Sequence, residues 1–267
     1  MPRSQFMIRF GYFGQFFHGL QPQKDVPTAG AALRDLITQA AGQPPKALCF
    51  AARTDKGVHA IGNIATFWFK APFNIQSFLE NLAGLQVPGL RDIQCFEVDR
   101  HTHARGSSAA KRYRYALNGP DEQTSWQIIP ERNLDAMREA LTYILGEHDF
   151  SSFRTSGCTA GTPVKTIYEA IISPSPDSGE GLGVRFPSGT RSVTGGVYID
   201  LYGDAFLRQM IRILVGVLCE IGTGLRKPED MKVILEAKSR QAAGITAPAC
   251  GLTLLSVELK GLGALET

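Results

Sequence analysis

The chain has 267 residues, of which 43% are hydrophobic and 20% charged, proportions typical of a globular rather than a disordered protein. Its 28 basic and 25 acidic residues give a net charge of +3, which neither requires nor excludes a nucleic-acid partner. No apolar stretch approaches the roughly 18 residues of a membrane span, and the start lacks the zones of a secretory signal, so we expect a cytoplasmic protein. The five cysteines form no C-x-x-C pair, and we expect reduced, buried thiols.

The first hundred residues alternate between strand and helix patterns. Runs rich in aromatic and β-branched residues predict strands, and stretches with helical periodicity predict helices. Thr28 and Asn74 suit the N-cap positions of the two helices. The predicted strands cover residues 5–13, 46–52, 62–70 and 91–99, and the predicted helices cover 28–41 and 74–83. This order of strand–helix–strand–strand–helix–strand predicts an α/β half, which we place at residues 1–104.

A second half of similar size, residues 105–267, repeats the alternation. Asp204 suits the N-cap of a long apolar helix at 204–221. Strands are predicted at 110–117, 162–172, 195–202 and 251–259, and further helices at 133–145 and from Pro228. The stretch 174–196 is dense in Gly, Pro and Ser, and we expect it to be a mobile insertion. The sequence thus predicts two α/β halves, each with a sheet covered by helices on one face.

The strongest local signal is the segment ARTDKGVHA, residues 52–60. An apolar strand ends at Ala52, and Arg53, Asp55 and Lys56 then bring charges onto a tight connection. Cations on both sides favour the charged form of the Asp55 carboxylate. Such a carboxylate can be a nucleophile, a general base or a metal ligand, but a solvated surface turn would contain the same residues. The pattern alone leaves these alternatives open.

A second signal is the basic run at residues 100–115, which contains no acidic residue and includes Arg105. Aromatic rings interleaved with cations on a strand can stack on unpaired bases and contact phosphates, which favours a single-stranded nucleic-acid surface. The alternative is a pair of core tyrosines beside a solvated sheet edge. Because strand side chains alternate, we expect Lys111, Tyr113 and Tyr115 on one face and Arg112 and Arg114 on the other.

A third signal is the long apolar helix expected from Asp204. Its apolar sides are interrupted by a thin polar stripe, on which Arg208 and Arg212 are neighbours four residues apart. A buried guanidinium needs a negatively charged partner, and Glu220, two turns further, is poorly placed to supply it. We therefore expect the partner to come from elsewhere in the fold, with Asp55 as the candidate. The alternative is an Arg212 side chain that reaches solvent.

Together these residues resemble the tRNA pseudouridine synthases of the A type. The family segments G-R-T-D-x-G-V-H-A, A-R-R-Y-R-Y, G-x-A-F-L-x-x-M-x-R and A-P-x-x-G-L-x-L match residues 52–60, 110–115, 203–212 and 247–254. The resemblance runs from about residue 42 to the C-terminus. The first forty residues fit less well, because Phe13 and Leu20 stand where the family has Asp and Trp. We expect these changes to affect RNA contacts and to leave the chemical centre untouched.

The resemblance implies a pseudouridine synthase fold, with two halves like ferredoxins or RNA recognition motifs and helices covering a mainly antiparallel sheet. It implies isomerisation of uridine to pseudouridine in the tRNA anticodon stem-loop, typically at positions 38–40, by a homodimer without metal or organic cofactor. By matching motif positions, Asp55 would be the catalytic nucleophile and Arg212 would pair with it. Arg53 would help extrude the target nucleotide. Tyr113 would stack on the base of that nucleotide, and Leu252 would close an apolar wall around the uracil. The substrate RNA would also contact Arg105, Lys111 and Arg208.

The sequence also allows three alternative functions. A non-catalytic RNA-binding module would share the strand–helix order, but its usual Lys/Arg-Gly-Phe/Tyr signature is missing here. A paralogue could act on a different RNA. An aspartate-dependent hydrolase has little support, because the chain contains neither a G-x-S-x-G elbow nor a phosphate-binding G-x-x-x-x-G-K-[ST] loop.

Overall fold

The computed structural model describes residues 3–119, 121–128, 132–174, 192–193 and 196–261. The chain forms two compact units, called here unit 1 and unit 2. Unit 1 comprises residues 1–111 and the C-terminal segment from Thr253, and unit 2 comprises residues 112–252. The sequence predicts a single division after residue 104. The two compact units instead divide within strand β5 (Ser108–Leu117), and most of strand β11 (Leu252–Leu259) belongs to unit 1.

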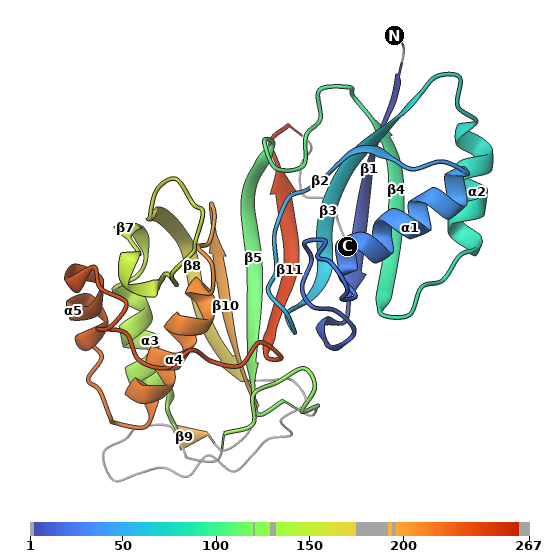
Figure 1. Ribbon diagram of the computed structural model, residues 1–267. Coiled ribbons are helices and arrows are strands. Elements are labelled where there is room, and N and C mark those ends of the chain that lie inside the picture. Colours follow the sequence, from blue (N-terminus) through green and yellow to red (C-terminus); the bar gives the residue numbers. More distant parts are fainter. Residues whose placement is uncertain (1–2, 120, 129–131, 175–191, 194–195, 262–267) are drawn as a thin grey trace. The chain divides into compact units, whose positions relative to one another are not determined.

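Unit 1 has the predicted order of strand–helix–strand–strand–helix–strand (Figure 1). Its elements are β1 (Arg3–Tyr12), the 3-10 helix η1 (Gly14–Phe16), α1 (Ala29–Ala41), β2 (Lys46–Phe50), β3 (His59–Lys70), α2 (Ile75–Gly84) and β4 (Leu90–Val98). The strands follow the order β4-β1-β3-β11, and β2 also pairs with β3. These pairs are antiparallel except for β3 with β11. Helices α1 and α2 pack together on the sheet.

Local sequence explains both helices of unit 1. The Thr28 hydroxyl accepts the N–H of Ala31 at 3.3 Å, and the Asn74 side chain accepts the N–H of Ser77 at 3.0 Å, so both predicted N-caps are confirmed. Each such cap contributes about 1 kcal/mol. On the buried side, an aromatic cluster joins the sheet to α2: the Phe78 ring lies 5.4 Å from that of Phe6.

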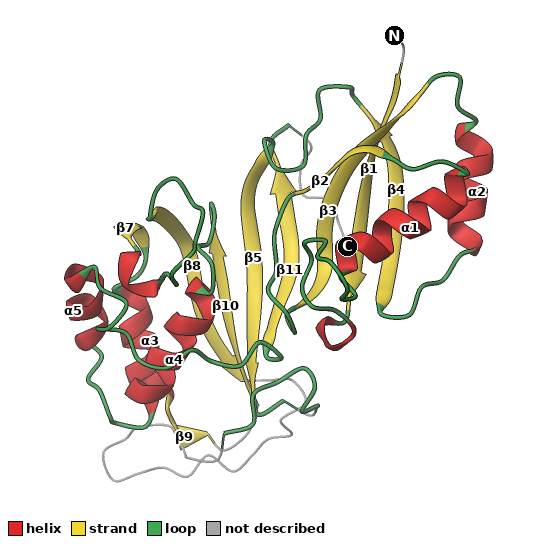
Figure 2. Cartoon of the chain, in the orientation of Figure 1, coloured by secondary structure: helices red, strands yellow, loops and turns green. Residues whose placement is uncertain are grey.

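Unit 2 places helices on one side of an antiparallel sheet (Figure 2). Its strands follow the order β5-β10-β8-β7, with a separate two-stranded sheet of β6 and β9. The elements after β5 are β6 (Arg132–Asn133), α3 (Leu134–Thr142), β7 (Gly146–Asp149), the 3-10 helix η2 (Ser151–Phe153), β8 (Val164–Pro174), β9 (Ser192–Val193), β10 (Val197–Gly203), α4 (Met210–Gly222) and α5 (Asp230–Ala237). Helix α3 packs against α4, α5 and β8. The predicted fold class, mixed α/β with mainly antiparallel sheet covered by helices, is confirmed.

The start of the long apolar helix was predicted wrongly. Helix α4 begins at Met210 rather than at Asp204, and it follows Gln209, whose φ of +61° lies in the left-handed region. The Asp204 carboxylate instead accepts the N–H groups of Thr166, at 3.0 Å, and of Ala205, at 2.6 Å. Asp204 therefore fixes an irregular connection to strand β8, a long-range role that an N-cap pattern does not reveal.

Three further predictions concern the Gly-rich insertion, the cysteines and membrane-spanning helices. The predicted Gly-rich insertion at 174–196 lies largely outside the described residues. All five cysteines are free, but only Cys219 is buried, so the prediction of burial is wrong for the other four. Within the described part of the chain, none of the helices has both the length and the hydropathy needed to span a bilayer.

Candidate active site

Asp55 lies on the loop that joins β2 to β3, and a buried asparagine fixes the base of this loop. The N–H of Ala51 donates to the Ile64 carbonyl at 2.8 Å. Next to it, the side chain of Asn63, fully buried, accepts the N–H of Ala52 at 3.4 Å and donates to the carbonyl of Ala52 at 3.1 Å. Beyond this base the loop contains a tight turn, in which the Val58 N–H donates to the Asp55 carbonyl at 3.2 Å. Asp55 itself is half-buried.

The turn after Asp55 depends on glycine in two places. Gly57 has a φ of +82°, a conformation that residues with a Cβ rarely adopt. A Cβ at Gly14, in η1, would lie 2.4 Å from the Gly57 carbonyl oxygen, so the two backbones touch. The Gly14 N–H also donates to Nδ1 of the buried His59 at 3.1 Å. The segment after β1 thus packs directly against the Asp55 loop.

Contacts from the N-terminal segment continue along this loop. The hydroxyls of Tyr12 and Thr54 are 2.7 Å apart, and burial raises the pKa of Tyr12 to about 12, so its hydroxyl stays protonated at neutral pH. The Leu20 N–H donates to the Thr54 carbonyl at 3.2 Å. A Cβ at Gly19 would lie 2.9 Å from the same carbonyl oxygen. The N-terminal segment therefore supports the Asp55 loop, mainly through backbone groups. The expectation that the atypical Phe13 and Leu20 side chains leave the chemical centre untouched stays a prediction.

The three basic residues that were predicted for RNA binding in unit 1 fall into two groups. The side chains of Arg53 and Arg105 line one pocket, although they are far apart in the sequence. Lys111 lies on β5, and its ammonium donates to the Ser108 hydroxyl at 2.8 Å. The structure thus brings Arg53 and Arg105 together beside the loop that carries Asp55.

In unit 2, Arg212 lies in the first turn of α4, and its backbone and side chain hold one residue of the following loop. Its Nε–H donates to the Ala247 carbonyl at 2.7 Å, and the Ala247 N–H donates to the Arg212 carbonyl at 3.0 Å. This pair of hydrogen bonds fixes the direction in which the half-buried Arg212 side chain leaves the helix.

The segment that begins at Ala247 also carries Leu252. The Tyr115 hydroxyl donates to the Pro248 carbonyl at 2.8 Å, and the Ala116 N–H donates to the Gly251 carbonyl at 2.8 Å. Leu252 follows and is 6% exposed. The segment is therefore attached to α4 at one end and to β5 at the other, and it brings the predicted residues Arg212 and Leu252 into one assembly.

Tyr113 lies on β5 with 6% of its surface exposed. Its ring meets that of Phe206 edge to face, with centroids 5.3 Å apart. Phe206 belongs to the irregular connection before α4, and Arg208, two residues later, is exposed. Phe206 is thus a neighbour of Tyr113 that sequence reasoning missed, although it is part of the motif that contains Arg212.

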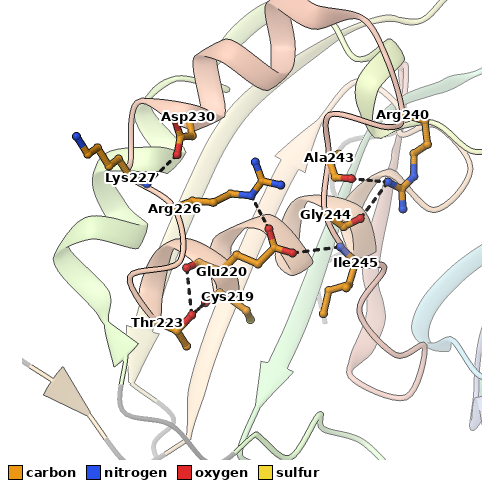
Figure 3. A network of polar contacts seen from close by, with 10 residues as sticks. All are labelled: Cys219, Glu220, Thr223, Arg226, Lys227, Asp230, Arg240, Ala243, Gly244 and Ile245. Carbon is orange, nitrogen blue, oxygen red and sulfur yellow. Dashed lines mark hydrogen bonds and ion pairs between the residues drawn. The ribbon is translucent and has the colours of Figure 1, made fainter.

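Figure 3 shows the charged network that holds the loop before Ala247. The Glu220 carboxylate, near the end of α4, accepts the Nε–H of Arg226 at 2.5 Å and the N–H of Ile245 at 3.3 Å. The Arg240 guanidinium donates to the carbonyls of Ala243 and Gly244 at 2.9 and 3.0 Å. Glu220 therefore binds this loop and Arg226. This agrees with the expectation that Glu220 is poorly placed to be the partner of Arg212.

The other face of β5 does not present unpaired cations. Arg112 forms an ion pair with Glu169 at 2.7 Å, and Arg114 forms a bidentate pair with Asp200 at 2.8 and 2.7 Å. The Arg112 pair lowers the pKa of Glu169 through hydrogen bonding and charge. Tyr113 and Tyr115 are buried on the opposite face. For Arg112, Arg114 and the fully buried Tyr115, the alternative of a core tyrosine beside paired cations describes the structure better than a nucleic-acid surface. The roles of Tyr113, Arg105 and Lys111 stay predictions.

The predicted site residues are divided between the two units. Arg53, Asp55, Arg105 and Lys111 belong to unit 1, and Tyr113, Arg208, Arg212 and Leu252 belong to unit 2. The contacts above hold the segments that carry these residues within each unit, and the pairing of Arg212 with Asp55 stays a prediction. Within the described residues no three His, Cys, Asp or Glu side chains gather as metal ligands would. The chemistry that these groups offer is that of a carboxylate on a fixed loop, with arginines nearby in unit 1.

Comparison with known proteins agrees with the site motifs. The family model described as tRNA pseudouridine synthase matches residues 140–259. A Francisella philomiragia protein named tRNA pseudouridine synthase A is 32% identical over 264 residues, covering 96% of this chain and 94% of that protein. Proteins of the same name from a Thermoanaerobacter species and from Syntrophotalea carbinolica are 31% and 33% identical, and cover 94% and 92% of this chain and 98% and 92% of their own lengths. The chain therefore belongs to the tRNA pseudouridine synthase A family, and the protein is an isomerase.

Proposed function

We propose that this protein converts uridine to pseudouridine in the anticodon stem-loop of tRNA, typically at positions 38–40, with Asp55 as the catalytic nucleophile. The observation that supports this most is the Asp55 loop itself. Its base is fixed by the buried Asn63, and its flank is supported by backbone contacts from the N-terminal segment. A carboxylate held on such a loop loses little conformational entropy when it meets a reacting atom.

The remaining roles that the resemblance implies agree with the physical demands of this reaction. A base inside a helical stem cannot present its glycosidic bond to a carboxylate, so it must be flipped out, which costs a few kcal/mol. Arg53 would assist this step from the same loop as Asp55. Tyr113 would then stack on the flipped base, an interaction typically worth about 1–3 kcal/mol. Leu252 would form the apolar wall that keeps the cleaved uracil in place.

Arg212 would supply the positive charge that stabilises the Asp55 carboxylate. A guanidinium next to a carboxylate favours its charged form even where water is scarce. The two hydrogen bonds between Arg212 and Ala247 support this role, because they restrict the guanidinium to one direction. Arg105, Lys111 and Arg208 would contact the RNA backbone, so affinity should fall steeply as salt is added.

We further propose that the protein works in the cytoplasm as a homodimer, and that the reaction uses neither a metal nor an organic cofactor. A single carboxylate and a flipped nucleotide suffice for the chemistry described above. The competing possibilities are a non-catalytic RNA-binding protein and a relative that modifies another RNA.

A tritium-release assay tests this proposal. Isomerisation exchanges the hydrogen at C5 of the target uracil, so tRNA labelled there releases tritium to water when pseudouridine forms. We expect release from wild-type anticodon stem-loops and none when the uridines at positions 38–40 are all replaced by cytidine. Binding without release would favour the non-catalytic alternative, and release that persists after this replacement would show a different target.

A further inference from the structure

Three arginines of unit 1 surround one pocket of about 260 Å³. Arg53 comes from the Asp55 loop, Arg105 from the turn before β5, and Arg34 from helix α1. Arg34 was not singled out in the sequence, where it is one exposed residue of an amphipathic helix. The structure shows that α1 brings it to the same pocket as the other two.

The charge in this pocket is not neutralised by the protein. Among the described residues, no acidic side chain lines the pocket. The guanidinium groups of Arg34, Arg53 and Arg105 make no side-chain hydrogen bond or ion pair with any described residue. By contrast, Arg112 and Arg114 in unit 2 are both paired with acids. Three unpaired guanidiniums around one cavity repel each other and create a strong preference for an anion.

The rest of the lining adds an apolar wall and one polar amide. Leu48 and Phe50 on β2 form part of the wall, and Gln21 contributes a side chain that can donate and accept hydrogen bonds. The volume lies a little below the ~300 Å³ at which ligand pockets usually begin. This size suits one phosphate with its sugar, and guanidinium groups match phosphate oxygens in two-point hydrogen bonds.

The placement of Arg34 follows from the pattern of α1. Leu33, Leu36 and Ile37 are buried against the unit, which leaves the side of the helix that carries Arg34 exposed. Gln21 directly follows Leu20, whose N–H is bonded to the Thr54 carbonyl. The pocket is therefore built on the same support as the Asp55 loop, and part of its lining comes from the first forty residues, which depart most from the family pattern.

We infer that this pocket binds a phosphodiester of the substrate RNA, one or two nucleotides from the base that reaches Asp55. This inference rests on the proposed function. Arg53 and Asp55 are separated by one residue, and two residues of chain span at most about 7 Å. A single RNA strand can therefore occupy both places, with a phosphate between the arginines while the neighbouring nucleotide is held out of its helix.

Binding of an anticodon stem-loop to Arg34→Ala tests the inference, with Lys70→Ala as the control. Lys70 is an exposed residue of unit 1 that does not line the pocket, and both variants lose one positive charge. Each phosphate contact contributes about 0.7–0.9 to the slope of the logarithm of the binding constant against the logarithm of the salt concentration. Loss of one contact therefore corresponds to a loss of about five- to eightfold in affinity at 0.1 M salt. We expect these losses in Arg34→Ala and in Arg105→Ala, and a much smaller change in Lys70→Ala.

A scan with neutral linkages identifies the phosphate. Stem-loops that each carry one methylphosphonate are bound to wild type and to Arg34→Ala. We expect one linkage whose neutralisation weakens binding to wild type about fivefold and weakens binding to Arg34→Ala less, because only Arg53 and Arg105 are left there to contact that phosphate. Equal affinity and salt slope for Arg34→Ala and Lys70→Ala, or a scan in which every linkage affects both proteins equally, would overturn the inference. Failure of the proposed function would appear separately, as bound tRNA without tritium release.

Discussion

Replacing Gly216 with alanine tests how strictly the loop before Ala247 must be placed. Gly216 lies in the middle of α4, where a Cβ would be 2.0 Å from the Ile245 carbonyl oxygen and 2.9 Å from its carbonyl carbon. Both are backbone atoms, so the loop must move by roughly 1 Å or more to reach ordinary contact. Ile245 is two residues from Ala247, whose carbonyl holds Nε of Arg212 at 2.7 Å.

Two opposing terms set the effect of this change on stability. Alanine is more favourable than glycine in a helix by about 1 kcal/mol, whereas an overpacked contact costs about 1–3 kcal/mol. We expect a net loss of about 1 kcal/mol, which lowers the melting temperature by about 2–4 °C for a chain of this size. The effect on catalysis should be larger, because a displacement of about 1 Å near a reacting group can reduce the rate about a hundredfold.

The assay compares kcat on saturating tRNA with the melting temperature of the same preparation. Gly84→Ala is the matched control, because Gly84 ends helix α2 and a Cβ added there would meet no atom within 4 Å. We expect Gly84→Ala to keep its activity and Gly216→Ala to lose kcat by about tenfold to a hundredfold at a small cost in stability. A folded Gly216→Ala with kcat within twofold of wild type would refute the idea that this loop positions Arg212.

Two further predictions concern titration and reactivity in unit 2. Arg112 lowers the pKa of Glu169, so the stabilisation from this partly exposed pair is present at neutral pH and is lost as the pH falls through the lowered pKa. Urea unfolding should show Glu169→Gln less stable than wild type by less than about 1 kcal/mol at pH 7. This difference should shrink as the pH falls below the ordinary pKa of a glutamate, and a difference that stays constant with pH would contradict the assignment. Burial raises the pKa of the Cys219 thiol to about 12. Burial also acts to raise the pKa of the Cys158 thiol, but hydrogen bonds from the N–H groups of Arg208 and Ala160, together with nearby arginine charges, bring this pKa below its ordinary value. Iodoacetamide at pH 8 should therefore modify Cys158 well before Cys219 in the native protein, and equal rates measured by mass spectrometry would contradict this assignment.

Local sequence predicted the elements that depend on local interactions. The caps of α1 and α2 need only an oxygen at Thr28 or Asn74 and an N–H three residues later. The prediction of where α4 starts failed for the opposite reason, because it depends on a contact between distant residues. Asp204 looks like an N-cap, but its carboxylate binds the Thr166 N–H in β8, which is 38 positions away in the chain. No local pattern distinguishes these two uses of an aspartate.

The parts of the candidate site that are formed by side chains could be predicted from the sequence. The parts that are held by backbone hydrogen bonds could not. Asp55, Arg53 and Arg212 stand in motifs that can be recognised from residue types and spacing. The carbonyl of Ala247 and the N–H of Leu20 have no such signature, because every residue has these groups. Arg34 was missed because its role depends on how α1 is rotated relative to a loop that is distant in sequence.

The most direct test of the account is the activity of Asp55→Asn and Asp55→Ala on tRNA, measured together with RNA affinity. Asparagine keeps the size of the side chain and removes its charge, and alanine excludes recovery of activity by deamidation. We predict that both variants bind the anticodon stem-loop within about threefold of wild type and form pseudouridine more than about 10³-fold more slowly. Turnover within tenfold of wild type in either variant would contradict the assignment of Asp55 as the nucleophile.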